Sequence, residues 1–208
     1  VVTHVDWHEK RTLMKVAFPV EVLSPRATYH IQYGTIERNT HDNDPRDRAR
    51  FEVTGQHWAD LSEGDYGVSL LNDCKYGYDV KGNVVRLSLL RAPIQPDPEA
   101  DQGHHDMTYA LYPHGGDWRS GTVRQGFELN VPLFAFVTES SPGSRPAMDA
   151  FASVDADNII VDNVKKHEDS QAVIVRLYEA HGQRGTGEVT FSETPKTVFE
   201  CDMMEEND

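Results

Sequence analysis

The chain has 208 residues and a formal net charge of −14 at pH 7, from 34 acidic and 20 basic side chains. A surface this acidic repels phosphate backbones and anionic headgroups, so we expect no nucleic acid partner and no membrane partner. No window approaches the run of about 18 apolar residues that a transmembrane helix needs. The two cysteines, Cys74 and Cys201, lie far apart and form no CxxC pair, which favours reduced thiols over a disulfide.

The first residues, VVTHVDWHEKR, contain no initiator Met and no charged region followed by an apolar run. This pattern predicts no signal peptide. Together with the expected reduced thiols, it indicates a cytoplasmic protein. We also expect the visible start to be a fragment boundary.

Two long alternating stretches come first. Residues 12–22 alternate apolar and polar side chains and predict a strand with one buried face. Residues 27–36 predict a second strand, and the Ser24-Pro25 turn between them favours an antiparallel hairpin. Residues 37–48 are polar and without period, which predicts a surface loop longer than a usual hairpin connection. Long loops are often functional, although a merely solvated loop is an equal alternative here.

The middle of the chain predicts short strands separated by turns. These strands are expected at residues 51–53, 58–61, 66–71, 76–80, 84–90 and 107–112. The stretch 93–103 is rich in Pro and Asp and predicts a loop. Residues 117–130 predict a helix, which Gly121 and Gly126 weaken by roughly 1 kcal/mol each relative to Ala. Among the aromatic residues, Trp58, Tyr66 and Tyr78 are expected to fill the core.

A second region follows a stretch with linker composition at residues 139–146. We therefore predict one domain over residues 1–140 and a small β-sandwich module over residues 150–208. Strands are expected at residues 158–164, 171–178, 188–191 and 197–203, and the apolar run 172–175 suits a strand buried on both faces. With about ten strands and at most one helix, the fold class is all-β, most simply two stacked antiparallel sheets.

Common catalytic and metal motifs are absent from the sequence. Residues 97–103 superficially resemble a calcium loop, but Gln102 and Thr108 stand where an EF-hand needs Gly and a bidentate Glu. There is no HExxH motif, no GxSxG elbow and no phosphate-binding loop. A paired Cys–His site cannot be derived from spacing, so Cys74 is expected to be buried and unreactive. Sequence does not supply the carboxylate separation that glycoside hydrolysis requires, and we nominate no such pair.

A polar cluster at residues 72–77, NDCKYG, is the most unusual feature that remains. Amide, carboxylate and amino groups can bind sugar hydroxyls, and aromatic rings can stack on sugar faces. Loop aromatics near such groups therefore suit a carbohydrate site, whereas core packing is the alternative role for most of these rings.

Several long blocks resemble one family in the same order along nearly the whole chain. HWADLSEGDYGVSLLNDCKYGYDV, LSLLRAPIQPDPEADQG and YALYPHGGDW resemble the C-terminal β region of family 38 glycoside hydrolases, of the cytosolic and vacuolar α-mannosidase type. VRLYEAHGQRG resembles the further C-terminal β module of these proteins. The resemblance implies an antiparallel, galactose-mutarotase-like β supersandwich.

The resemblance also implies a division of labour. Family members are retaining α-mannosidases whose N-terminal domain carries an aspartate nucleophile and a divalent metal, usually zinc, held by His and Asp. No block of this chain matches those motifs, so we expect no catalytic residue and no metal ligand here. The implied partners are the missing N-terminal catalytic domain and mannose-containing glycans.

Two sets of residues are implied to reach the substrate or the neighbouring domain. The block YGTIERNTH and the loop after it contribute the first set: Arg38, Thr40, His41 and Asn43. The block NDCKYG contributes the second set: Asn72, Asp73, Lys75 and Tyr76. The chain is thus expected to be a non-catalytic β region of an enzyme that hydrolyses terminal α-linked mannose. The alternatives are an independent carbohydrate-binding module and a purely structural interface domain.

Overall fold

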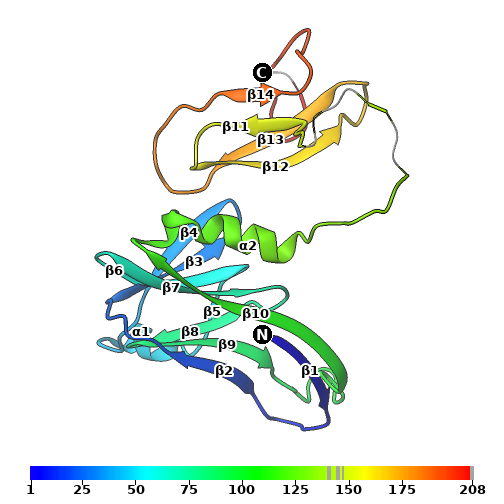
Figure 1. Ribbon diagram of the computed structural model, residues 1–208. Helices are drawn as coiled ribbons and strands as arrows, with labels where there is room; N and C mark the ends of the chain where they lie inside the picture. Colours follow the sequence, from blue (N-terminus) through cyan, green and yellow to red (C-terminus); the bar gives the residue numbers. More distant parts are fainter. Residues whose placement is uncertain (140–141, 144–145, 147, 207–208) are drawn as a thin grey trace. The chain divides into compact units, whose positions relative to one another are not determined.

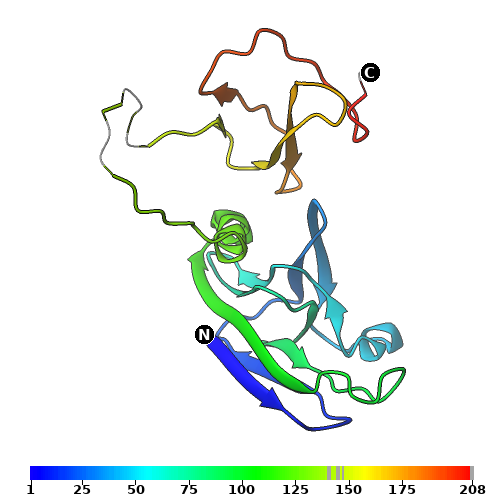
Figure 2. The ribbon, with the colours of Figure 1, turned by 90° about the vertical axis from the view of Figure 1, so that its right-hand side faces the viewer.

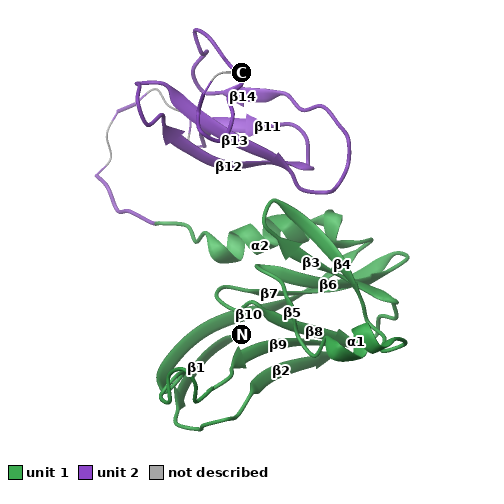
Figure 3. Cartoon of the chain, turned by 180° about the vertical axis from the view of Figure 1, so that it is seen from behind, with its two compact units in different colours: residues 1–134 green, residues 135–208 purple. Residues whose placement is uncertain are grey.

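The computed structural model describes residues 1–139, 142–143, 146 and 148–206. Figure 3 shows two compact units, Val1–Phe134 and Ala135–Asp208. Part of the stretch for which we predict a linker, namely residues 140–141 and 144–145, lies outside the described residues. Each unit is described by itself below. Among the described residues, no helix combines the length and the hydrophobicity that crossing a membrane requires.

The first unit contains a six-stranded sheet in which every neighbouring pair is antiparallel (Figure 1). Its order is β1-β10-β7-β6-β3-β4. The strands are β1 (Val2–Trp7), β3 (Arg26–Ile31), β4 (Gly34–Asn39), β6 (Trp58–Glu63), β7 (Tyr66–Asn72) and β10 (Gly103–Gly115).

A four-stranded antiparallel sheet completes the first unit, in the order β2-β9-β8-β5. Its strands are β2 (Met14–Pro19), β5 (Val53–Thr54), β8 (Gly77–Lys81) and β9 (Val84–Leu90). Side chains from both sheets form one core cluster, with Leu61 and Leu70 from one sheet and Tyr78 and Leu87 from the other at 0% exposure. Burying each such side chain contributes about 2 kcal/mol.

The other face of the six-stranded sheet is also covered. Since side chains alternate along a strand, Trp58 and Asp60 of β6 and Ser69 of β7 point away from that core cluster. They are nevertheless buried, because η1 (Trp118–Ser120) and α2 (Thr122–Asn130) pack on this face. The predicted helix over residues 117–130 is confirmed, and Gly121, with φ of 134°, separates its two parts.

The second unit is built from two antiparallel strand pairs. β11 (Ala152–Val154) pairs with β14 (Val189–Phe191), and β12 (Ile159–Lys166) pairs with β13 (Val173–Glu179). The prediction of a strand at residues 197–203 is wrong, because only Cys201 there forms a bridge. The prediction that residues 172–175 are buried on both faces is also wrong, since Val173 is 53% exposed on its two-stranded sheet.

The all-β antiparallel fold class is confirmed, but several local predictions for the first unit are not. Residues 12–22 and 27–36 do not form one hairpin: β2 pairs with β9, while residues 27–36 fold back on themselves as β3 and β4. Strand β1 was not predicted. The polar loop contains a short helix, α1 (Pro45–Ala49), capped by Asp44. Trp58 and Tyr78 are buried as predicted, whereas Tyr66 is 40% exposed.

Candidate functional site

The polar cluster at residues 72–77 is a turn organised by a buried amide. Asn72 ends β7, and its Oδ1 accepts hydrogen bonds from the backbone N–H groups of Cys74, at 3.0 Å, and Lys75. Its Nδ2 donates to the carbonyl of Gln56 at 3.0 Å and to the hydroxyl of Tyr78. The side chain is thus fully engaged in holding the turn to the core.

The rest of this cluster faces outward. Asp73 accepts a hydrogen bond from the Thr108 backbone N–H at 3.0 Å. Partial burial works against ionisation of Asp73, but hydrogen bonds from the Cys74 thiol and Thr108 outweigh it and lower the pKa of this carboxyl. Lys75 is half-buried, and Tyr76 is 60% exposed. Of the second predicted set, Asp73, Lys75 and Tyr76 are therefore available at the surface.

Cys74 departs from its predicted environment. It is exposed rather than buried. Desolvation, followed by the hydrogen bond and negative charge of Asp73, raises the pKa of the Cys74 thiol to about 11. The unreactive character predicted for it would thus come from partial desolvation together with its neighbour Asp73, and not from full burial.

The first predicted set lies where β4 leads into α1. Thr40 is buried, and its hydroxyl donates to the Ser24 carbonyl at 2.6 Å. His41 Nδ1 lies 3.6 Å from Asp47 Oδ2, and Asn43 is exposed. The buried Asp47 carboxylate also accepts two hydrogen bonds from Asn39 Nδ2, at 3.0 and 3.2 Å. Thr40 holds the segment in place, and His41 and Asn43 are its outward-facing members.

Arg38 occupies an unusual position at this end of β4. Its guanidinium carbon lies 4.7 Å from the centroid of the Tyr29 ring, in cation–π geometry. Its Nη1 is buried and has no hydrogen-bond partner in the described part of the chain. Burial is the main cause that lowers the pKa of Arg38. The Tyr29 ring in turn meets Tyr78 edge-on at 6.2 Å.

These contacts settle how the two predicted sets are related. In the sheet order, β3 and β6 lie between β4, which carries the first set, and β7, which leads into the second. The sets are therefore not neighbours on the sheet. A chain of contacts links them through the core, because Arg38 contacts Tyr29, Tyr29 contacts Tyr78, and Tyr78 is hydrogen-bonded to Asn72.

A buried group beneath α2 has the composition of a Ser-His-Asp triad but not its geometry. His114 Nε2 lies 2.7 Å from Asp60 Oδ2 and 3.3 Å from Ser69 Oγ, and Ser69 also lies 2.7 Å from the Thr122 hydroxyl. A triad requires the carboxylate and the hydroxyl on different ring nitrogens. Here both meet Nε2, and the buried Nδ1 has no partner among the described residues. The group therefore connects β6, β7, β10 and α2, and it activates no nucleophile.

A second histidine cluster on the same face is also a packing feature. The His30 ring stacks on Trp58 at 5.7 Å, and His30 Nδ1 accepts a hydrogen bond from the His57 backbone N–H at 3.3 Å. Burial, and then the nearby His57 ring, lower the pKa of His30 to about 4. The ring is therefore neutral at physiological pH and suits a tightly packed interface.

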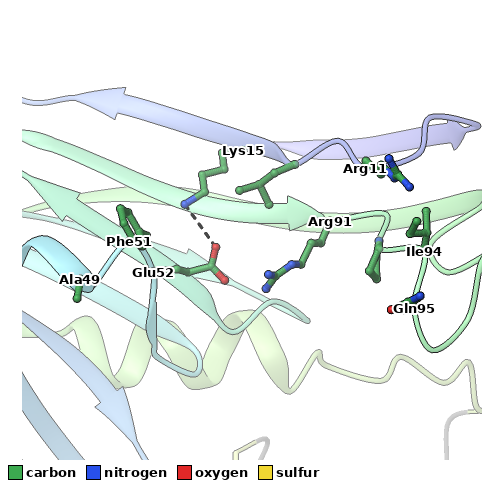
Figure 4. Close-up of a pocket in the computed structure, with 10 residues that line it drawn as sticks. Arg11, Lys15, Ala49, Phe51, Glu52, Arg91, Ile94 and Gln95 are labelled. Carbon is green, nitrogen blue, oxygen red and sulfur yellow. Dashed lines mark ion pairs between the residues drawn. The ribbon is translucent and has the colours of Figure 1, made fainter.

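An open groove of about 880 Å³ lies beside β2 and β9 (Figure 4). Three cations line it, Arg11, Lys15 and Arg91, with Glu52 as its single acidic side chain. Lys15 Nζ lies 3.4 Å from Glu52 and 2.7 Å from Asp79, so its charge is already neutralised. This groove could not be predicted from the sequence, because its lining comes from three separate segments, around residues 11–15, 49–52 and 91–95.

The described residues contain no cluster of three or more His, Cys, Asp or Glu side chains that could hold a metal ion. In the stretch that superficially resembled a calcium loop, Asp101 accepts hydrogen bonds from the backbone N–H groups of Arg91 and Ala92, at 2.9 and 2.8 Å. Asp101 thereby fastens the loop to the end of β9.

Two family models match the chain. The model described as "Glycosyl hydrolases family 38 C-terminal domain" matches residues 1–99, and that described as "Glycosyl hydrolases family 38 C-terminal beta sandwich domain" matches residues 158–208. Alpha-mannosidase 2C1 of Mus musculus is 43% identical over 212 residues, and alpha-mannosidase G of Dictyostelium discoideum is 44% identical over 209 residues. These alignments cover 99% and 98% of this chain.

Solved structures agree with this relationship at the level of fold. An alpha-mannosidase from Enterococcus faecalis V583 superposes with a TM-score of 0.86 at 20% identity, covering 99% of this chain and 24% of that one. The chain spans only 20% of the mouse relative and 19% of the Dictyostelium relative. It therefore corresponds to one region of much longer proteins.

Proposed function

The chain belongs to the C-terminal region of glycosyl hydrolase family 38, and from this premise we propose that it is the non-catalytic β region of a retaining α-mannosidase. The observation that carries the proposal is the 43% identity to alpha-mannosidase 2C1 across 99% of this chain. The active site, with a divalent metal that the resemblance gives as zinc, would lie in an N-terminal catalytic domain outside this chain. The substrate would be a glycan with terminal α-linked mannose.

In this role the chain supports the catalytic domain and contributes surface to it. Of the predicted site residues, His41, Asn43, Asp73, Lys75 and Tyr76 remain the candidates for contact with a partner domain or the substrate, and the partial exposure of their side chains supports this proposal. Thr40 and Asn72 act behind them, since both are buried and bonded to the fold.

Arg38 joins the two groups through the core tyrosines. The two free cysteines, Cys74 and Cys201, support a cytoplasmic location.

The test compares the full-length protein with this chain alone on an aryl α-mannoside, with zinc or cobalt added. We expect turnover with the full-length protein and none above background with the 208-residue chain. Turnover by a clean preparation of the chain alone would overturn the division of labour. An inactive full-length protein would overturn the assignment as a mannosidase.

A second candidate, an independent carbohydrate-binding module, is favoured by one observation: the exposed ring of Tyr76 stands beside Asp73 and Lys75. Against it, Trp58 and Trp118 are buried and cannot stack on a sugar. Titration of the chain with mannosides separates the two roles, because clear binding at millimolar or lower concentration would favour the module.

A further inference from the structure

The first unit is open along one side. β1 is the outermost strand of the six-stranded sheet, β2 is the outermost strand of the four-stranded sheet, and residues 8–13 connect them. Both unpaired edges therefore border the same side of the sandwich, and Figure 2 shows the two blue strands together. Unpaired edges of this kind are templates for a further strand.

Burial falls towards this side. In the centre of the core, residues such as Leu70 and Leu87 are completely covered. Beside the open edges, the inward-facing side chains are only partly buried although they pack on the same core; these are Val5, Trp7, Met14, Val16 and Phe18. Trp7 Nε1 is also buried without a hydrogen-bond partner among the described residues. An unpaired buried donor is unfavourable, so the core is incomplete here.

The opposite side is closed. There the chain passes from β4 to β5 through residues 40–52, which include α1 and two buried side chains, Thr40 and Asp47. The core beside this connection is covered, with Tyr29 at 1% exposure. Among the described residues, six partly buried apolar side chains pack against the core cluster; five lie on the β1–β2 side and one, Val53 of β5, lies on the opposite side. Incomplete burial is thus concentrated on the β1–β2 side.

The register shows which backbone groups of β1 are free. The Val1 amino group donates to the Tyr109 carbonyl at 2.7 Å, and the Tyr109 N–H donates to the Val1 carbonyl at 3.0 Å. In an antiparallel pair, residues bonded in this way recur at every second position. Thr3, Val5 and Trp7 therefore bond to β10. Val2, His4 and Asp6 direct their N–H and C=O groups to the open edge.

We propose that the β1–β2 side is a docking surface for a β-strand from the N-terminal part of the full-length protein, which pairs with β1 through Val2, His4 and Asp6. The occupant is a segment of the same protein because the relatives extend far beyond this chain, which covers about 20% of their length. The inference rests on the proposed function only in that it takes this chain to be the C-terminal region of a longer protein.

The chemistry of the two faces defines the docking strand. On the outward face of β1, His4 pairs with Asp106 and His8 with Asp6, so this face is polar and already satisfied. The inward face presents half-buried apolar side chains and the unpaired Trp7 donor. The docking strand should therefore alternate, with apolar side chains towards Val5 and Phe18, polar ones outward, and a hydrogen-bond acceptor near Trp7.

Residue-resolved hydrogen exchange, compared between the full-length protein and this chain, tests the proposal. In the chain alone, we expect the amides of His4 and Asp6 to exchange quickly, while those of Thr3 and Val5 are slow and serve as internal controls. In the full-length protein, the His4 and Asp6 amides should slow by at least about 100-fold, as expected of amides inside a sheet.

A pair of variants makes the test specific. His4→Pro removes the edge N–H, whereas His4→Ala keeps it and loses the same ring. In the full-length protein, His4→Pro should reduce protection of the Asp6 amide by about tenfold or more and His4→Ala should not, because one lost hydrogen bond is worth about that factor. Pro is tolerated at an edge position whose N–H faces outward, so the chain alone should fold with either variant.

Several outcomes would overturn the inference. One is rapid exchange of the His4 and Asp6 amides in the full-length protein. Another is protection in the chain alone that rises with its concentration, which would assign the edge to a second copy. If the full-length protein has mannosidase activity but its β1 edge is not protected, the docking surface is refuted and the proposed function stands. If the β1 edge is protected but the full-length protein has no mannosidase activity, the proposed function is refuted and the docking surface stands.

Discussion

Asn72 is the residue on which the polar turn at 72–77 depends. Replacing it with Ala removes the acceptor of two backbone N–H groups and the donor to Gln56 and Tyr78. We expect Asn72→Ala to lower the free energy of unfolding by about 2 kcal/mol, measured from urea unfolding curves. Asn43→Ala, at an exposed position, is the control and should change stability by less than about 0.5 kcal/mol. Equal effects of the two substitutions would refute this role.

The reactivity of the Cys74 thiol is expected to depend on pH. With a pKa of about 11, the exposed thiol is almost entirely protonated at pH 8, and only the thiolate reacts with iodoacetamide. In a Cys201→Ser background, alkylation at pH 8 should be roughly 100-fold slower than in the urea-unfolded chain, where an ordinary thiol pKa is near 8.5. The rate should rise as pH increases towards 11.

The cause can be checked separately from the rate. Asp73→Asn removes the negative charge beside the thiol, and it should lower the pKa of Cys74 and speed alkylation at pH 8. A conservative change at an exposed carboxylate elsewhere, Asp106→Asn, should leave the rate unchanged. If Cys74 reacts at pH 8 like a free thiol, Asp73 does not control it.

At this scale, sequence marked the unusual residues but not their roles. The cluster NDCKYG stands out as polar within an apolar region. That Asn72 is buried follows from its contacts with Gln56 and Tyr78, which lie 16 and 6 residues away and meet it only after the sheets form. Thr40 is similar, because its partner Ser24 is 16 residues distant.

Among the elements, α2 depends on a close approach at Gly126. A Cβ at this position would lie 2.8 Å from Trp58 Cδ1, and Trp58 is fixed between His30 and Trp118. We expect Gly126→Ala to destabilise the protein by about 1–3 kcal/mol, even though Ala favours a helix by about 1 kcal/mol over Gly. Urea unfolding measures the change.

A neighbouring position supplies the control. Arg124 is exposed on the same helix and pairs with Glu128, so Arg124→Ala should cost no more than about 0.5 kcal/mol. A stabilised Gly126→Ala variant would show that helix propensity outweighs the contact with Trp58.

Element types could be predicted from the sequence better than their pairing. Alternation identifies β2 and β3 as strands, but a short turn between two strands suits both a hairpin and a crossing from one sheet to the other. Two missed elements did leave signals. β1 alternates Thr3, Val5 and Trp7 with polar residues, and Asp44-Pro45 supplies the N-cap and first position of α1.

For the whole molecule, the fold class and the family could be predicted because they rest on patterns spread over the full length. Which apolar side chains the fold leaves incompletely buried could not be predicted. The run at residues 172–175 has the composition of a strand buried on both faces, yet β13 has a single partner, β12. Apolar side chains that are left exposed and apolar side chains that are covered by a second strand or sheet cannot be distinguished in the sequence. An exposed apolar surface is therefore informative only once the structure is known.

The segment following α2 carries a run of exposed apolar side chains of this kind. Leu133, Phe134, Phe136 and Val137 are between 82% and 104% exposed. Such a run favours association in water, since burying each side chain would contribute about 2 kcal/mol. We therefore expect this chain, in isolation, to associate at micromolar concentrations, as measured by sedimentation velocity.

Substitution separates this segment from other exposed apolar residues. The triple variant Leu133→Ser, Phe134→Ser and Phe136→Ser should remain monomeric at about tenfold higher concentration, because most of the apolar area is gone. Phe51→Ser removes a comparably exposed ring from a different surface, at 80% exposure, and should not change association. If Phe51→Ser abolishes association and the triple variant does not, the chain associates through the groove beside β2 and not through the segment after α2.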